Sequence, residues 1–195
     1  MTTRTALFVI DIQNDLTTDP ATRIPAADRI RTAGEKILTT ARRLQTDNIR
    51  DAKSDPPGMI VIVQHEDLPG QGPLKKDTPA WELVFPPETG EYLVQKTTRD
   101  TFESNPHLAE MLKRKGVEHI WAFGIQSECC VESTCIGALN AGFRVTLLRG
   151  AHSTYDVDGK SAAEVEKEVE HRLEGRGALI EDWEKVVRLW GAMIG

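Results

Sequence analysis

The chain has 195 residues, of which 39% are hydrophobic and 28% are charged, and this composition suits one soluble globular domain spanning residues 1–195. A formal net charge of −6, with no dense Lys/Arg cluster, argues against a nucleic-acid partner. No apolar run approaches the length of a membrane span, and no signal-peptide pattern precedes the first apolar segment. We therefore expect a cytoplasmic protein that does not contact a membrane.

All three cysteines lie in one short segment, at Cys129, Cys130 and Cys135. Adjacent residues and close helical neighbours rarely have disulfide geometry, so these residues form a poor disulfide framework. They also lack the paired spacing and the second ligand pair of a structural zinc site. Free thiols in a reducing compartment are the expectation.

The first third of the chain reads as strand, helix, loop and strand. Residues 5–10 are a continuous apolar run that ends at Asp11, which is typical of a strand buried on both faces. Helical spacing of apolar residues predicts a helix over 26–44, and the polar, proline-containing stretch 46–58 predicts a surface loop. A second buried strand follows at 59–63.

Residues 64–90 contain many prolines and glycines, which excludes long regular elements. Trp81 and Phe85 make this segment more aromatic than an ordinary linker. These two aromatic residues either line a substrate pocket or complete the core.

Strands and helices alternate through the remainder of the chain. In order, the pattern predicts a strand at 91–95, a helix at 108–115, a strand at 118–123, a helix at 130–141, a strand at 143–148, a helix at 161–173, a strand at 177–180 and a helix at 183–193. Trp183 and Trp190 are expected on opposite sides of the last helix, with one of them facing a partner subunit.

This alternation predicts a mostly parallel sheet covered by helices on both faces, a three-layer α/β/α fold. Ligands in such folds bind beyond the carboxyl ends of the strands. Asp11 ends the first strand, Lys96 ends the third, and Cys130 follows the fourth. We therefore expect these three residues to share one crevice.

Asp11, Lys96 and Cys130 supply an acid/base carboxylate, a cation and a nucleophile, which together suit acyl transfer through a thioester. A thiol near the first turn of a helix has its pKa lowered from about 8.5 toward roughly 3.5–7.5, and Cys130 holds that position. The alternative is that each residue is structural: Asp11 caps a loop, Lys96 lies on the surface and the cysteine is buried.

Four segments, in chain order, resemble the motifs of the isochorismatase-like cysteine hydrolases, and together they cover nearly the whole chain. The segments are Ala6–Asp15 (ALFVIDIQND), Val94–Lys96 (VQK) with downstream Phe102, Gly124–Val131 (GIQSECCV) and Ala151–Asp156 (AHSTYD). One D-x-Q-N-D motif alone would be weak, whereas the ordered set is specific.

The resemblance implies a six-stranded sheet in the order 3-2-1-4-5-6 and a homo-oligomer. It also implies that Cys130, rather than Cys129, is the nucleophile. Asp11 would be the proton acceptor and donor, and Lys96 the cation that orients the pair.

The resemblance further implies a cis peptide bond between Ile125 and Gln126. This bond would direct the backbone N–H groups of Gln126 and Cys130 into an oxyanion hole. The implied activity is hydrolysis of a C–N bond in a small amide, ureido or carbamoyl compound, with Gln13, Trp81 and Phe85 as the candidate substrate-binding residues.

No metal or cofactor is expected. Nicotinamidases of this family commonly have an Asp-x-His metal element after the second strand, and the corresponding segment here reads Gln64-His65-Glu66-Asp67. His65 and Glu66 are alternatives as metal ligands, but a lone histidine beside carboxylates is more often a hydrogen-bonded pocket group. A competing function is a redox sensor or ligand-binding protein on the same scaffold, with Cys129 and Cys130 as the sensing thiols.

Overall fold

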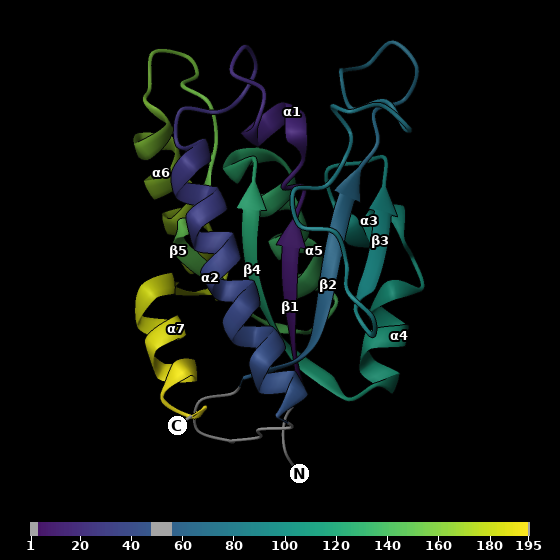
Figure 1. Ribbon diagram of the computed structural model, residues 1–195, viewed down its shortest axis with the longest axis vertical. Coiled ribbons are helices and arrows are strands. Elements are labelled where there is room, and N and C mark those ends of the chain that lie inside the picture. The colour runs from purple at the N-terminus through teal and green to yellow at the C-terminus, as the bar shows by residue number, and fades with distance from the viewer. Residues whose placement is uncertain (1–3, 48–55, 195) are drawn as a thin grey trace.

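Continuous apolar segments form one six-stranded sheet in the computed structural model, which describes residues 4–47 and 56–194 (Figure 1). Neighbouring strands are all parallel, and their order is β3-β2-β1-β4-β5-β6. The predicted fold class and strand order are therefore confirmed. The strands are β1 (Arg4–Ile10), β2 (Pro57–His65), β3 (Tyr92–Lys96), β4 (Val117–Ile125), β5 (Arg144–Ser153) and β6 (Leu179–Asp182).

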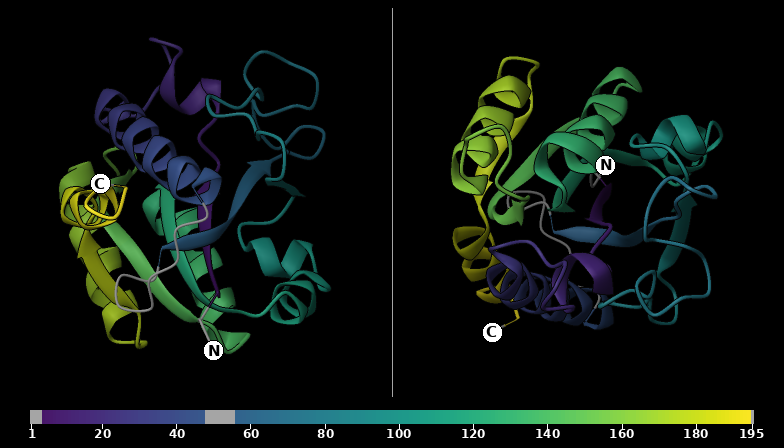
Figure 2. Two further views of the ribbon diagram at one scale, coloured as in Figure 1. Left: turned by 60° about the horizontal axis from the view of Figure 1, so that its bottom comes forward. Right: turned by 90° about the horizontal axis from the view of Figure 1, so that it is seen from above.

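Helices cover both faces of the sheet (Figure 2). One face packs against α2 (Ala27–Thr46) and α7 (Trp183–Gly191). The opposite face packs against α4 (Leu108–Arg114), α5 (Glu132–Asn140) and α6 (Ala162–Glu174). Three short elements complete the described chain: α1 (Asn14–Thr17), α3 (Thr101–Ser104) and the π-helical turn η1 (Ser127–Val131). None of the described helices is long and apolar enough to cross a membrane.

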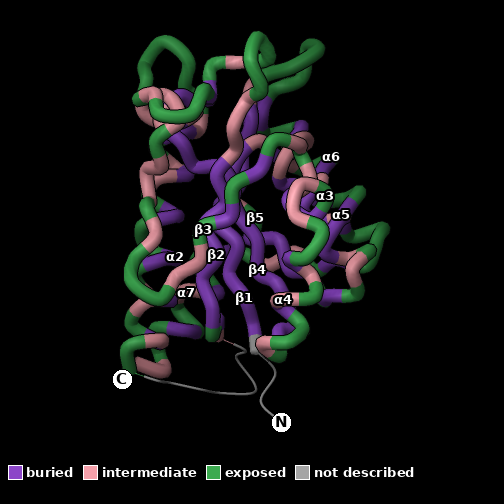
Figure 3. The backbone as a smooth tube through the Cα atoms, turned by 90° about the vertical axis from the view of Figure 1, so that its right-hand side faces the viewer, coloured by how far each residue is buried: buried purple, intermediate pink, exposed green. Residues whose placement is uncertain are grey.

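Strand β1 lies at the centre of the sheet and contributes to two cores (Figure 3). Because side chains alternate along a strand, Ala6, Phe8 and Ile10 join the core beneath α5, whereas Leu7 and Val9 join the core beneath α2. All five residues are buried. Burial on both faces explains why the sequence of β1 is apolar without interruption.

The elements differ from the sequence prediction mainly at their ends. Strand β5 continues to Ser153, beyond the predicted end at residue 148, because its pairing with β4 shifts register between Ala122 and Gly124. The four-residue helices α1 and α3 were not predicted. Residues 48–55 of the predicted 46–58 loop lie outside the described residues.

The prediction that Trp183 and Trp190 lie on opposite sides of α7 is wrong. The two residues are seven positions apart, which is nearly two helical turns, so both lie on one face. Both are buried against the core beneath α2, and the Trp190 ring packs edge-on against Trp121 at 5.5 Å between centroids. Both rings are thus buried within this chain, and self-association stays a prediction.

The carboxyl ends of β1 and β4 approach closely at Gly124. This residue pairs with Ile10 and has a φ of +141°. A Cβ atom here would collide with the Ile10 carbonyl oxygen, so only glycine fits. The close approach brings the residues after β4 next to Asp11, which follows Ile10.

Replacing Gly124 with alanine should lower the free energy of unfolding by roughly 2–5 kcal/mol, because positive-φ strain adds to overpacking. Gly159→Ala is the matched control, since Gly159 has a φ of +78° but no atom within 4 Å of the point that a Cβ would occupy. The control should lose only the strain component, about 1–2 kcal/mol. Urea unfolding of both variants measures the difference, and equal losses would contradict a steric requirement at Gly124.

Candidate active site

Asp11 and Lys96 form a buried ion pair at the carboxyl ends of β1 and β3. Asp11 has a left-handed backbone, with a φ of +51°, and its N–H donates to the Val63 carbonyl oxygen at 3.1 Å. Lys96 is the last residue of β3. Its Nζ atom lies 2.7 Å from Asp11 Oδ2, and the lysine and aspartate side chains are 0% and 1% exposed. Two strands that are not neighbours are thereby joined across the end of β2.

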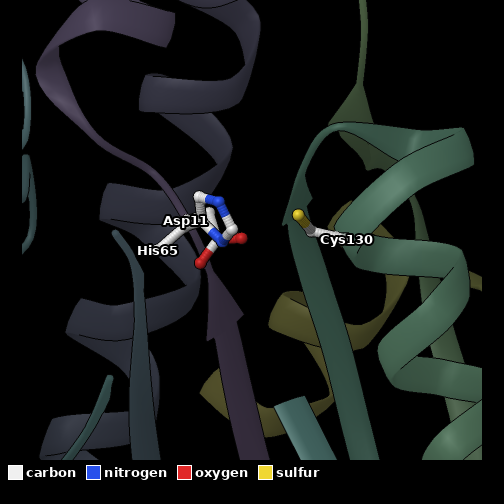
Figure 4. A group of neighbouring side chains, drawn as sticks. All are labelled: Asp11, His65 and Cys130. Carbon is white, nitrogen blue, oxygen red and sulfur yellow. The ribbon is translucent and has the colours of Figure 1, made fainter. Parts of the chain in front are cut away.

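Cys130 reaches the same point from the other half of the sheet. Strand β4 ends at Ile125, and the η1 turn that follows contains the cysteine. Its Sγ atom accepts a hydrogen bond from Lys96 Nζ at 3.2 Å. Figure 4 shows this sulfur pointing toward Asp11 and His65, and one ligand atom from each of these three side chains lies within 4.8 Å of the others. The structure thus brings together the aspartate, lysine and cysteine that the sequence placed in one crevice.

Buried hydrogen bonds hold the η1 turn in place. The Ile125–Gln126 peptide bond that precedes it is cis, as the resemblance implied. Ser127 Oγ lies 2.8 Å from His152 Nδ1, and His152 Nε2 lies 3.4 Å from Glu170 Oε1. Ser127 and His152 have no exposed surface, so this serine–histidine–glutamate chain fixes the turn rather than contacting a substrate.

Burial raises the pKa of the Cys130 thiol well above its ordinary value, and the Asp11 carboxylate raises it further, whereas Lys96 lowers it. The expectation that this cysteine has a lowered pKa is therefore wrong for the resting site. The helix-start effect is local, whereas desolvation and the Asp11 charge arise only when the strands pack together. Cys130 rests as a neutral thiol, so it needs a proton acceptor before it can act as a nucleophile.

His65 connects Lys96 to Asp67. It pairs with Lys96 in the β2–β3 register, and its Nδ1 atom lies 3.0 Å from Lys96 Nζ. Burial and the Lys96 charge lower the pKa of His65, so its ring is neutral at neutral pH. Because an ammonium group can only donate, Nδ1 accepts and the ring proton lies on Nε2, 3.2 Å from Asp67 Oδ1. His65 is thus a hydrogen-bonded pocket group.

Lys96 remains an ammonium group in this environment. Burial acts to lower its pKa, but the charge of Asp11 and the interaction with Cys130 outweigh burial and raise it. The site therefore holds a fixed positive charge between a carboxylate and a thiol.

A cavity of about 440 Å³ opens at these side chains, within the usual range of about 300–1,000 Å³ for small-molecule sites. It lies beyond the carboxyl ends of the strands, where ligands bind in folds of this class. Its lining residues are Asp11, Asp15, Leu16, His65, Asp67, Gln71, Gly72, Pro73, Leu74, Arg99, Ile125, Gln126, Cys129, Cys130 and Tyr155.

Gln13, Trp81 and Phe85, which the sequence assigned to substrate binding, are not among the lining residues. The fully buried Gln13 amide donates to the carbonyl oxygens of His65 and Trp81 and accepts from the His65 N–H, so it holds the end of β2 in place. The Phe85 ring packs against Gly34 of α2. Gln13 and Phe85 thus make contacts within the fold, and substrate binding by Gln13, Trp81 and Phe85 stays a prediction.

Three lining residues that sequence reasoning did not select are Asp15, Arg99 and Tyr155. Each lies in or near a recognised motif: Asp15 ends the opening motif, Arg99 follows Lys96 in the next turn, and Tyr155 lies in the 151–156 segment. Proximity to a motif was therefore the sequence signal that could have identified these three residues as cavity-lining. The direction of each side chain depends on loop geometry that has no periodic pattern.

Asp11, His65 and Cys130 offer oxygen, nitrogen and sulfur atoms close enough to hold one metal ion. The Lys96 ammonium group lies 2.7, 3.0 and 3.2 Å from these side chains, respectively, so a positive charge already contacts all three. Within the described parts of the chain, Glu66 does not belong to this group.

Two relatives match over 154 residues, both streptothricin hydrolases from Streptomyces noursei. The first is 34% identical, and the matched region covers 78% of this chain and 55% of the relative. The second is 33% identical, and the matched region covers 78% of this chain and 50% of the relative. The chain therefore spans about half the length of the curated relatives it matches.

Solved structures share the fold at low sequence identity. A cysteine hydrolase from Pseudomonas syringae pv. phaseolicola 1448A has a TM-score of 0.79 at 19% identity, covering 97% of this chain and 93% of that chain. N-carbamoylsarcosine amidase from Thermoplasma acidophilum has a TM-score of 0.72 at 19% identity, and the match covers 93% of this chain and 97% of the amidase chain. The family model described as Isochorismatase domain matches residues 5–169. The chain therefore belongs to the isochorismatase-like hydrolase family.

Proposed function

We propose that this protein hydrolyses a C–N bond in a small amide, ureido or carbamoyl compound through a thioester on Cys130. The observation that carries the proposal is the contact of one buried ammonium group with both a carboxylate and a thiol, at the wall of a cavity of small-molecule size. A nucleophile, a proton acceptor and a fixed cation at one point are the components of covalent acyl transfer.

The first step is proton transfer from the Cys130 thiol to Asp11 as the sulfur attacks the substrate carbonyl carbon. Asp11 Oδ1 is buried and accepts no hydrogen bond from the described residues, so it is available for this proton. Lys96 stabilises the developing negative charge. The backbone N–H groups of Gln126 and Cys130 would donate to the oxyanion, where losing one donor typically costs about 2.7–4 kcal/mol of barrier.

The intermediate then collapses, the C–N bond breaks, and Asp11 returns its proton to the departing amine. Asp11 next takes a proton from water as the water oxygen attacks the thioester. The C–S bond breaks, the carboxylic or carbamic acid leaves, and the proton returns to the Cys130 sulfur. Each proton taken is returned, so the site regains its resting state.

The substrate class is supported by the chemistry of the site and by the curated relatives. A thiol nucleophile paired with an acid that can protonate a leaving amine suits amide-type bonds. The curated relatives are named as hydrolases of streptothricin, and one protein with the same fold is named as an amidase of a carbamoyl compound. Several charged and hydrogen-bonding side chains on the cavity wall suit a small polar substrate.

The redox-sensor alternative has less support. Sensor cysteines act as accessible thiolates with lowered pKa values. Burial raises the pKa of Cys129, with a further contribution from Glu128, and the pKa of Cys130 is raised as well. Neither thiol has the ionisation that such a sensor requires.

Cys130→Ala should reduce turnover by roughly 10⁴-fold or more, because it removes the attacking atom. The assay is ammonia release from a panel that includes nicotinamide, ureido acids and N-carbamoyl amino acids. Cys135→Ala is the matched control, because Cys135 lies within the α5 core and outside the cavity lining. Activity of the Cys130 variant comparable to that of the control would remove the thioester mechanism.

Asp11→Asn should lower the pKa of Cys130, because the Asp11 carboxylate raises it in the native site. Iodoacetamide should therefore alkylate Cys130 faster at pH 8 in this variant, and the midpoint of its pH profile should move to lower pH. Peptide mass spectrometry measures the rate at this one thiol. Asp28→Asn controls for the loss of a surface charge, since the Asp28 side chain is 69% exposed. An unchanged or upward-shifted midpoint would contradict the assigned electrostatics.

His65→Leu should lower kcat by on the order of 10²-fold with little change in KM, because it releases the Lys96 ammonium group from one of its partners. His65→Gln keeps an acceptor and a donor and should restore most of the rate. Steady-state kinetics of both variants, with an amide that the wild type hydrolyses, measure the separate changes in kcat and KM. Equal losses in the two variants, or a loss confined to KM, would show that His65 does not position Lys96.

A further inference from the structure

Asp15 is a buried residue whose carboxylate has no partner among the residues that the structure describes. It lies in the first turn of α1 and lines the same cavity as Cys130. Only 7% of its surface is exposed. Among residues 4–47 and 56–194, no group donates a hydrogen bond to its carboxylate and no cation lies within ion-pair distance. Its carboxylate oxygens are not among the inaccessible unpaired atoms of the described structure, so a ligand in the cavity can reach them.

The other carboxylates on the described cavity wall are already paired. Asp11 contacts Lys96, and Asp67 is 3.2 Å from His65 Nε2 and accepts from the Leu74 N–H at 2.8 Å. Asp15 is thus the acidic group on the wall that remains available for a ligand.

The Tyr155 hydroxyl does not satisfy the Asp15 carboxylate either. Tyr155 shares the cavity wall, but its hydroxyl donates to the Thr22 carbonyl oxygen at 2.5 Å. Burial raises the pKa of Tyr155, and the negative charge of Asp15 raises it further, so the field of this carboxylate extends over the cavity wall. The rim cation Arg99 is exposed and forms no ion pair with Asp15 in the described structure.

We propose that Asp15 binds a positively charged ammonium or guanidinium group of the substrate while the scissile carbonyl lies at Cys130. As a statement about substrate class this deepens the proposed function and rests on it, although the cation site itself can be tested without turnover. The cavity then has two functional ends: the reaction takes place at Cys130, and Asp15 binds the positive charge of the substrate. An ion pair with a largely buried carboxylate favours a cationic ligand over a neutral analogue, because the neutral analogue leaves the charge unpaired.

The first experiment measures protection of Cys130 from iodoacetamide at pH 9, where butylammonium is still charged. Butylammonium should slow alkylation of wild-type Cys130 at least about tenfold more effectively than butan-1-ol at equal concentration. In Asp15→Asn this difference should disappear, whereas in the surface control Asp28→Asn it should persist. Each rate is compared with the same variant without additive, so a changed intrinsic reactivity does not affect the result.

The second experiment compares kcat/KM for 6-aminohexanamide and hexanamide, two primary amides that differ in a terminal ammonium group. Wild type should prefer the cationic amide at least about tenfold, mainly through KM, and Asp15→Asn should lose the preference. Hydrolysis of neither amide would count against the proposed function, while the protection experiment would still decide the role of Asp15.

Equal protection by butan-1-ol and butylammonium in wild type would overturn the cation site without any variant. Cation-selective protection that survives in Asp15→Asn would overturn the assignment to this residue. Thermal melting of each variant confirms that the comparison is made on folded protein.

Discussion

The buried ion pair between Asp11 and Lys96 is the interaction on which the rest of the site depends. Its two charges come from strands on either side of β2, and both side chains are essentially inaccessible. A buried ion pair is poor evidence of stabilisation, because desolvation of the two ions offsets most of their attraction. Its value here is chemical: the ammonium group also donates to the Cys130 sulfur and so fixes a cation between base and nucleophile.

The fold supports this pair from several directions. Glycine at position 124 lets β4 approach β1, so the η1 turn lies beside Asp11. The buried chain through Ser127 and His152 anchors that turn to β5 and α6. On the other side, His65 holds the lysine from the end of β2. Parallel strands in the order 3-2-1-4 are what bring these groups, distant in sequence, to one edge of the sheet.

The sequence predicted the sheet and the convergence of Asp11, Lys96 and Cys130 because buried parallel strands leave long apolar runs and end at the same edge. It did not predict α1 and α3, since a four-residue helix has no measurable periodicity. It assigned Gln13, Trp81 and Phe85 to substrate binding, and none of the three is among the residues that line the cavity. The path of the irregular 64–90 segment, which contains Trp81 and Phe85, is set by tertiary contacts that leave no periodic pattern in the sequence.

The ionisation of Cys130 also could not be predicted from local sequence. A helix start lowers a thiol pKa through local dipoles, but desolvation and the neighbouring carboxylate act through packing and have the opposite sign. The Cys130 thiol consequently stays neutral until its proton is transferred to Asp11. Such a site favours attack coupled to proton transfer over a permanently reactive thiolate, and it protects Cys130 from oxidation.

The most direct test of the account is a double-mutant cycle on the free energy of unfolding with Asp11→Asn, Lys96→Met and the double variant. Each single change leaves one buried charge uncompensated and should cost about 3–5 kcal/mol. The double variant should be destabilised by much less than the sum of the single variants, because neither charge remains. Single-variant effects that add to within about 0.5 kcal/mol would contradict a buried Asp11–Lys96 pair at the centre of the site.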